Sequence, residues 1–221
     1  MYTPKHFREE DLPTLHALMQ DYNFAILVTQ QNGIPQASHL PFIVDRERGQ
    51  YGTLLAHMAR ANTEWRAFAT MPEVLVIFQG PHTYVTPSWY EERLSVPTWN
   101  YAAVHVYGKP RIIEDTQEMY ALMEKLIQQS EARFEEQWQL DDIRGDYSDK
   151  LIRGTVGFEI EITRLEGKYK LSQNRPVVDR VHVAERLRQS ADAVDVEIAR
   201  LMQIRLPEDE TMGNGNERKQ S

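Results

Sequence analysis

The sequence contains no cysteine among its 221 residues. A chain without cysteine forms no disulfide framework, cysteine-ligated zinc finger or iron–sulfur cluster, and it has no thiol nucleophile. It also lacks any run close to the roughly 20 apolar residues that cross a bilayer. The N-terminal stretch MYTPKHFREEDL carries acidic side chains and no apolar core, which excludes a secretory signal. We therefore expect a soluble, cytoplasmic protein that does not contact a membrane.

Basic residues are also scarce, with 25 Lys and Arg against 33 Asp and Glu and a formal net charge of −8. The acidic excess is local, because residues 114–150 hold 11 acidic and 4 basic side chains. Proteins that coat nucleic acid usually have the opposite balance. Direct DNA binding is possible but is not supported by this charge balance. An anionic cofactor is compatible with the remaining, nearly neutral part of the chain.

Common catalytic signatures are absent as well. The sequence has no GxGxxG, GxxxxGK[ST], HExxH or GxSxG motif. None of its seven histidines forms a pair at i,i+3 or i,i+4 spacing, so no metal site is expected. No catalytic residue can be named, and the sequence leaves open whether the protein is an enzyme.

Short strands with tight turns dominate the first half of the chain. The runs 24–29 and 36–44 flank Asn32-Gly33, a pair typical of a two-residue hairpin turn. Further strands are predicted at 51–57, 74–80, 100–108 and 155–166. Strands and helices do not alternate, which argues against a parallel doubly wound sheet. We predict an α+β fold, an antiparallel barrel or strongly curled sheet with peripheral helices.

Helices are predicted around and between these strands. Asp11 is a candidate N-cap for the first helix, and a short helix is expected over 63–70. Asp115 and Glu118 have the spacing of a capping box at the start of the clearest helix. One long final helix is expected over 180–204, and its predicted inward residues are Val183, Leu187, Val194, Ile198 and Leu201.

The remaining segments complete the predicted organisation. The apolar pattern of the central helix extends as far as Phe134 and Trp138, whereas residues 81–99 resemble a loop with three prolines. A single domain is expected over 1–206, followed by a disordered polar tail over 207–221.

Two segments carry polar side chains where strands end. The segment ASHLPF, residues 37–42, interrupts a strand with polar groups just before a proline. In LLAHMARANTEW, His57, Arg60 and Asn62 lie at the exit of a strand and the start of a helix. Unpaired N–H groups at a helix start, together with an arginine, form a plausible phosphate cradle. The simpler interpretation is a solvated arginine beside a helix.

The segment 82–108 is too rich in aromatic residues for a polar loop. It contains Tyr84, Trp89, Tyr90, Trp99 and Tyr101. One interpretation is a protein interface or a core lid, because aromatic residues dominate such surfaces. The other is a stacking site for a flat heteroaromatic ligand, hydrogen-bonded by Thr98 and Asn100.

The segment GKYKLSQNR follows the last predicted strand directly. It offers Lys168, Lys170, Gln173, Asn174 and Arg175 within a few residues. The density of donors slightly favours a loop that recognises an anion or an amide over a solvated strand end.

These segments resemble the PaiB family, the FMN-binding negative transcriptional regulators. The resemblance runs from MYTPKHF to the last helix and is carried by HLPF, LLAHMARAN, GPHTYVTPSWY, VPTWNYAAVHVYG and GKYKLSQNR. It implies a split β-barrel related to the pyridoxamine-phosphate-oxidase and flavin-reductase group. It also implies a homodimer with FMN in a groove between subunits, and repression of protease and sporulation genes in bacteria.

The resemblance implies a set of FMN-binding residues. Related split barrels hold the phosphate on two adjacent strands and the turn after them, which corresponds here to Ser38, His39, His57, Arg60 and Asn62. The resemblance places Thr98, Trp99 and Asn100 near the isoalloxazine ring, and Lys170, Gln173 and Arg175 complete the pocket from the same or the partner subunit. Many related flavoenzymes have Arg or Lys where this chain has His39, which predicts weaker retention of FMN.

Three functions remain open from the sequence. The first is a dimeric FMN-binding repressor, as the resemblance implies. The second is an FMN-dependent oxidoreductase that uses the same groove, since flavin chemistry belongs mainly to the cofactor. The third is an interaction protein with a vestigial groove, whose aromatic loops form only the dimer contact.

Overall fold

The computed structural model describes residues 1–92 and 94–207, and its first two long strands form the predicted hairpin. The strands β2 (Phe24–Gln31) and β3 (Ile34–Pro41) are antiparallel, with Gln31 paired to Ile34. Asn32 and Gly33 have φ of 52° and 81°, both in the left-handed region. Such a turn follows the right-handed twist of the strands it joins, so this short-range prediction is confirmed.

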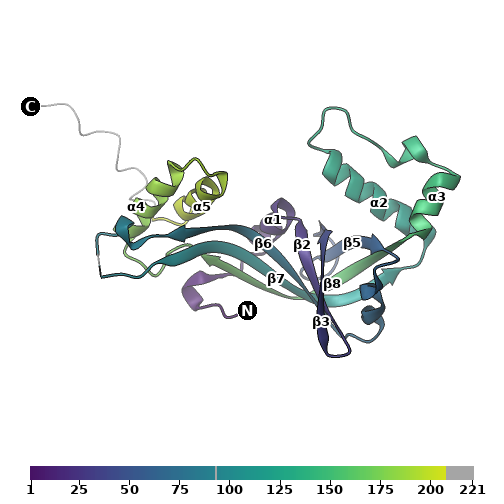
Figure 1. Cartoon of the computed structure of the whole chain (residues 1–221), viewed down its shortest axis with the longest axis horizontal. Coiled ribbons are helices and arrows are strands. Elements are labelled where there is room, and N and C mark those ends of the chain that lie inside the picture. The colour runs from purple at the N-terminus through teal and green to yellow at the C-terminus, as the bar shows by residue number, and fades with distance from the viewer. Residues whose placement is uncertain (93, 208–221) are drawn as a thin grey trace, which may run out of the picture. The chain divides into compact units, whose positions relative to one another are not determined.

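Eight strands form one sheet (Figure 1). The other strands are β1 (Arg8–Glu9), β4 (Ile43–Asp45), β5 (Thr53–Ala59), β6 (Val74–Val85), β7 (Thr98–Ile113) and β8 (Thr155–Lys170). Their order is β3-β2-β6-β7-β8-β5-β4, with β1 paired to β8. The pairs β2–β3, β2–β6, β4–β5 and β5–β8 are antiparallel.

A single residue joins the two opposite edges of this sheet. β3 ends at Pro41 and β4 begins at Ile43, although the two strands stand at opposite ends of the strand order. Consecutive Cα atoms are 3.8 Å apart, so the two edges lie within about 8 Å of each other at this point. The sheet must therefore roll up, yet β3 and β4 are not neighbours in the ladder. This is the predicted α+β split barrel, antiparallel and not closed.

Aromatic side chains fill the inside of the rolled sheet. The linking residue Phe42 is fully buried, with ring centroids 5.9 Å from Phe78 and 6.3 Å from Phe158. Phe68 lies 5.1 Å from Phe158. Phe158 belongs to the alternating run of β8, whose inward residues are buried as predicted.

Contacts divide the chain into two units. The first unit comprises Met1, Glu10–Gln79 and Val104–Gly167, and the second comprises Tyr2–Glu9, Gly80–Ala103 and the described part of Lys168–Ser221. Except for Pro207, the predicted polar tail lies outside the described residues. Within 1–92 and 94–207, no helix is both long and apolar enough to cross a membrane.

The described part of the chain also forms five α-helices. They are α1 (Leu12–Asp21), α2 (Thr116–Glu131), α3 (Asp146–Arg153), α4 (Val177–Arg188) and α5 (Ala193–Gln203), with short 3-10 turns η1 (Lys5–Phe7), η2 (Thr63–Ala69), η3 (Pro87–Trp89) and η4 (Leu140–Ile143). Asp11 caps α1 by accepting from the Thr14 amide, and the Asp115 carboxylate accepts from two amides of α2 at 2.9 Å. Both predicted N-caps are confirmed.

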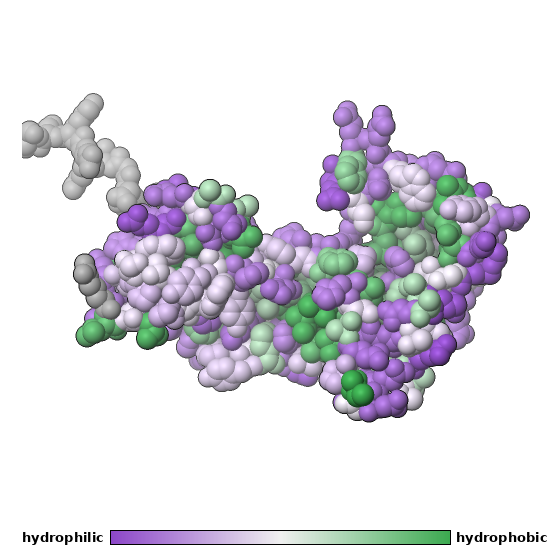
Figure 2. All heavy atoms as spheres, viewed as in Figure 1, coloured by the Kyte–Doolittle hydropathy of each residue, from purple (hydrophilic) through white to green (hydrophobic). Residues whose placement is uncertain are grey.

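The helices α2 and α3 cover one face of the sheet in the first unit. Their apolar side chains form a cluster with two strand residues: Leu55, Ile113, Met119, Leu122, Leu126 and Ile152. Figure 2 shows hydrophobic residues gathered where these two helices approach each other. Gly157 on β8 allows α2 to lie close, because a Cβ there would overlap the Met119 sulfur.

Two predicted boundaries of helices are wrong. The final helix over 180–204 is two helices, because Ser190 and Asp192 interrupt it and Asp192 caps α5 by accepting from the Val194 amide at 2.8 Å. Val194 is exposed rather than inward. The central helix ends at Glu131, and the side chains of Phe134 and Trp138 are exposed.

The predicted loop over 81–99 is also too long. β6 continues to Val85 and β7 begins at Thr98, so strands occupy both ends of this segment. Pro81 lies inside β6, although a proline usually marks the end of a strand because it lacks an N–H donor.

Candidate functional site

A buried carboxylate organises the polar residues at the end of β3. Thr29 donates to Glu64 Oε1 at 2.9 Å, and the Ser38 hydroxyl donates to Glu64 Oε2. The side-chain Nδ2 of Asn62 donates to the Ser38 hydroxyl at 2.9 Å, and its Oδ1 accepts from the backbone N–H of Glu64 at 3.0 Å. Ser38 and Thr29 share one face of the hairpin, because Ser38 pairs with Leu27 and Thr29 follows two residues later. Two of the predicted phosphate ligands therefore meet around Glu64.

Arg60 lies in the turn that follows β5. The backbone N–H of Asn62 donates to the Ala59 carbonyl at 2.9 Å and closes this turn. The Arg60 guanidinium donates from Nε to the Arg153 carbonyl at 2.7 Å and from Nη2 to the Thr155 carbonyl at 2.8 Å. These bonds use two of the five N–H donors of the group. They fix its position and tie the turn to the end of α3.

The two predicted histidines lie apart from the Glu64 network. His39 follows Ser38 on β3 and is exposed, so its side chain points to the opposite face of the strand. His57 lies on β5 opposite Gly157 and on the same face as Leu55, which packs under α2. Its Nδ1 atom is buried without a hydrogen-bond partner among the described residues. Burial lowers the pKa of His57, which favours its neutral form.

The sequence did not point to Glu64. It is 3% exposed and follows the capping residue Asn62, a position where acidic residues normally stabilise a helix start. Only the tertiary fold, which brings Thr29 and Ser38 to its two oxygens, shows that it belongs to a polar network.

In the second unit, Lys170 holds the start of β7. Its ammonium group donates to the Thr98 hydroxyl and, at 2.5 Å, to the Trp99 carbonyl. Burial lowers the pKa of Lys170, and the nearby charges of Lys168 and Arg175 lower it further. Three of the predicted residues are therefore in direct contact.

Asn100 and Gln173 stabilise the backbone of the segment after β8. Asn100 is fully buried and accepts from the Ser172 hydroxyl at 3.0 Å. Ser172 has a φ of 65°, a region that costs free energy for a residue other than glycine. Gln173 accepts from the Leu171 amide at 2.7 Å and donates to the Tyr169 carbonyl at 2.5 Å. The side-chain amides of Asn100 and Gln173 therefore already make hydrogen bonds within the chain.

Arg175 lies over the ring of Tyr90. Its guanidinium carbon is 4.6 Å from the ring centroid, and Nη1 donates to the Ser95 hydroxyl at 3.1 Å. Burial raises the pKa of Tyr90, against the opposing effect of the Arg175 charge. Arg175 therefore contacts the aromatic segment at two points, Tyr90 and Ser95.

Three rings form an exposed aromatic surface in the second unit. Trp99 is 54% exposed and Tyr84 is 47% exposed, with their ring centroids 5.9 Å apart and nearly perpendicular. The His82 ring lies 6.3 Å from Trp99. A flat ligand or another protein surface could bury these rings, which matches both interpretations of the aromatic segment.

No group of three or more His, Cys, Asp or Glu residues that could hold a metal ion occurs within the part of the chain that the structure describes. The predicted binding residues thus comprise polar and cationic groups in the first unit, and a lysine, an arginine and exposed rings in the second.

Comparison with known proteins gives a consistent result. Residues 1–164 match a family described as "Putative FMN-binding domain". The protease synthase and sporulation protein PAI 2 of Bacillus subtilis is 34% identical over 206 residues, which cover 93% of this chain and 98% of that protein. A protein of Emericella nidulans is 33% identical over 219 residues, covering 81% and 87% of the two chains.

The fold also matches solved structures of low sequence identity. An FAD- and heme-binding protein from Mycobacterium smegmatis superposes with a TM-score of 0.57 at 15% identity, covering 74% of this chain and 73% of that chain. This likeness supports the fold.

Proposed function

Because the chain belongs to the FMN-binding PaiB family, we propose that it is a cytoplasmic homodimer that binds FMN between its subunits and acts as a negative transcriptional regulator. FMN is the cofactor of this family. The dimer, the groove and the regulatory role are the proposal. Membership of the family supports all three, and the polar groups of the first unit support only a phosphate site.

The residues of the first unit fit a phosphate ester. Arg60 and Asn62 share one hydrogen-bonded turn, and Ser38 lies beside Asn62. His57 is not part of this group, because its side chain lies on the face of β5 that carries Leu55; its buried Nδ1 atom has no partner among the described residues. A guanidinium held in place by two carbonyls is well suited to a phosphate, because its remaining donors are already oriented.

The fixed position of Arg60 is the observation that carries the phosphate assignment. We expect Arg60→Ala to weaken FMN binding by about 10-fold to 100-fold, since a hydrogen bond to a charged group contributes about 1.5–3 kcal/mol. The measurement is titration of the purified protein with FMN, followed by flavin absorbance and fluorescence. Arg66→Ala is the matched control, because Arg66 lies over the Trp65 ring in the next turn.

The same substitution also removes donors from the Arg153 and Thr155 carbonyls, so its fold must be checked by circular dichroism. Arg60→Lys keeps the charge and loses the planar fork, and we expect an intermediate affinity from a folded protein. Unchanged affinity in both folded Arg60 variants would place the phosphate elsewhere. A protein that neither contains FMN nor takes it up would contradict FMN binding itself.

A substitution at Glu64 should change FMN affinity in the opposite direction to a substitution at Arg60. Its carboxylate occupies the Ser38 hydroxyl that would otherwise face an anion, and it adds a like charge beside the phosphate. We expect Glu64→Gln to strengthen FMN binding about tenfold, because the amide keeps the size and removes the repulsion. Glu136→Gln, at an exposed position of the acidic segment, is the control. Unchanged binding in a folded Glu64→Gln variant would show that the phosphate does not approach this network, and weaker binding would contradict the expected repulsion.

The regulatory role is separated from enzyme activity by two assays. Gel-shift titrations over a range of salt test direct DNA binding, and a shift that is absent even at low salt would leave only indirect regulation. Steady consumption of NADH or NADPH in the presence of FMN would favour an FMN-dependent oxidoreductase. Sedimentation at several concentrations tests the homodimer.

A further inference from the structure

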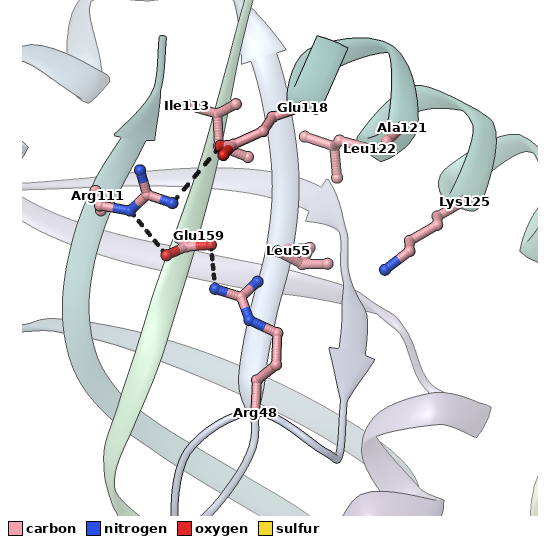
Figure 3. A pocket seen from close by; sticks show the side chains of 9 residues that line it. All are labelled: Arg48, Leu55, Arg111, Ile113, Glu118, Ala121, Leu122, Lys125 and Glu159. Carbon is pink, nitrogen blue, oxygen red and sulfur yellow. Dashed lines mark hydrogen bonds and ion pairs between the residues drawn. The ribbon is translucent and has the colours of Figure 1, made fainter. Parts of the chain in front are cut away.

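A charged cavity lies under helix α2 in the first unit, and none of the residues that line it is assigned to flavin (Figure 3). It has a volume of 260 Å³. Its inner wall is apolar and includes Leu55 of β5, Ile113 of β7 and Leu122 of α2, all members of the cluster that joins the helix to the sheet. Its rim is cationic and includes Arg48, Arg111 and Lys125.

One carboxylate holds the two arginines at this rim. Glu159 on β8 accepts from Arg48 Nη2 at 2.7 Å and from Arg111 Nε at 2.8 Å. Although burial raises it, these hydrogen bonds hold the pKa of Glu159 below its usual range. Two guanidinium groups are therefore fixed on opposite oxygens of a single anion, as the dashed lines in Figure 3 show.

The rim keeps unused donor capacity. Each guanidinium has five N–H donors, and the hydrogen bonds to Glu159 use one on each. Arg111 also approaches Glu118 at 3.8 Å, a loose ion pair. Lys125 lies 3.9 Å from the Asp45 carboxylate, beyond hydrogen-bond distance. Three positive groups thus border the cavity, two carboxylates line it, and the Asp45 carboxylate lies beside Lys125. The rim therefore offers N–H donors that these ion pairs do not use, rather than a net charge.

The volume and the apolar wall limit what the cavity can hold. A volume of 260 Å³ equals that of about nine liquid water molecules. An inorganic anion would leave the apolar wall uncovered, whereas a hydrocarbon alone would make no use of the remaining N–H donors at the rim. The complementary ligand has a small apolar body and one anionic end.

We propose that this cavity is a binding site for a small organic carboxylate whose apolar body rests on Leu55 and Leu122 and whose anionic end faces Arg48, Arg111 and Lys125. The site is independent of the flavin proposal, because none of its residues is among those assigned to FMN. Ligand binding here would join α2 to β5, β7 and β8 from the inside of the helix–sheet contact.

The probe for this site is 4-fluorobenzoate, observed by fluorine NMR during titration with the full-length protein. We expect saturable broadening of its signal. The neutral analogue 4-fluorobenzamide should bind at least about tenfold more weakly, because charge-assisted hydrogen bonds are roughly twice as strong as neutral ones. Inorganic phosphate at the same concentration should not displace the probe.

Two substitutions separate charge from shape. Lys125→Gln removes an ammonium group that makes only a loose ion pair, and it should weaken probe binding about tenfold without unfolding the protein. Ala121→Leu keeps every charge and a good helix former but fills the cavity, and it should abolish binding. Arg46→Gln is the control for loss of a positive charge. Arg46 lies with Arg48 in the turn between β4 and β5, contacts Gln20 and does not line this cavity.

FMN titration of the same variants shows whether the carboxylate site and the flavin site are separate. Ala121→Leu should lose the probe and retain its affinity for FMN. The proposal is overturned if the unmodified protein shows no saturable binding, if the amide binds as well as the carboxylate, or if Ala121→Leu binds the probe normally. In each of those cases the cluster is only an ion-pair network that fastens α2 to the sheet.

Discussion

Replacing Gly108 by alanine should lower the free energy of unfolding by about 3 kcal/mol or more. Gly108 lies in β7, and a Cβ at this position would overlap the carbonyl oxygen of Glu161 and come within 2.6 Å of Ile160 Cγ2. The carbonyl belongs to the backbone of the neighbouring strand β8, which cannot move away without breaking the ladder. Urea unfolding followed by tryptophan fluorescence measures this loss.

Gly33→Ala is the matched control for this substitution. Gly33 has a φ of 81°, but a Cβ there would meet nothing within 4 Å. Its cost should be about 1–2 kcal/mol, the strain of a left-handed residue alone. If the two variants were equally stable, close approach of β7 and β8 would not explain the glycine at position 108.

Phe42→Ala should lower the free energy of unfolding by about 3–5 kcal/mol. Phe42 is the only residue between β3 and β4, and its buried ring contacts the rings of Phe78 and Phe158. Its removal creates a cavity at the point where the two edges of the sheet meet. Because β3 carries Ser38, we also expect weaker FMN binding at temperatures where the variant is still folded.

The control for this effect is Phe24→Ala. Phe24 pairs with Pro41, the residue before Phe42, but it is 64% exposed, so its loss should change stability by no more than about 0.5 kcal/mol. A Phe42→Ala variant as stable as this control would show that the rolled sheet does not depend on its aromatic core.

Local signals in the sequence predicted the local structure well. The Asn32-Gly33 turn and the caps at Asp11 and Asp115 depend on neighbours within a few residues, and each is present. The errors arose where a local rule met tertiary packing. Pro81 lies within a strand, although proline usually ends one. Ser190 and Asp192 are typical helix-capping residues, but the apolar pattern continues across them and favoured one long helix.

The candidate site was less predictable because its parts come from distant segments. The resemblance to the PaiB family placed Ser38 and Asn62 in one phosphate site, and their side chains are in contact. It gave no sign that Glu64 would accept from Ser38 and Thr29, or that Arg60 would bind carbonyls of the segment 153–155. Such contacts depend on long-range pairing of strands, which hydrophobic periodicity does not encode.

The pairing of β5 with β8 has a consequence for how the chain folds. The register runs from Thr53 with Glu161 to Ala59 with Thr155, so each partner is made roughly 100 residues later. Loop closure over that distance costs entropy before any contact is gained, and folding rates fall as contacts become less local. During synthesis the β2–β3 hairpin can form early, whereas β5 remains without its β8 partner until the ribosome has released residues 155–161. A nascent chain arrested near residue 150 should therefore expose β5 and rely on chaperones to avoid aggregation.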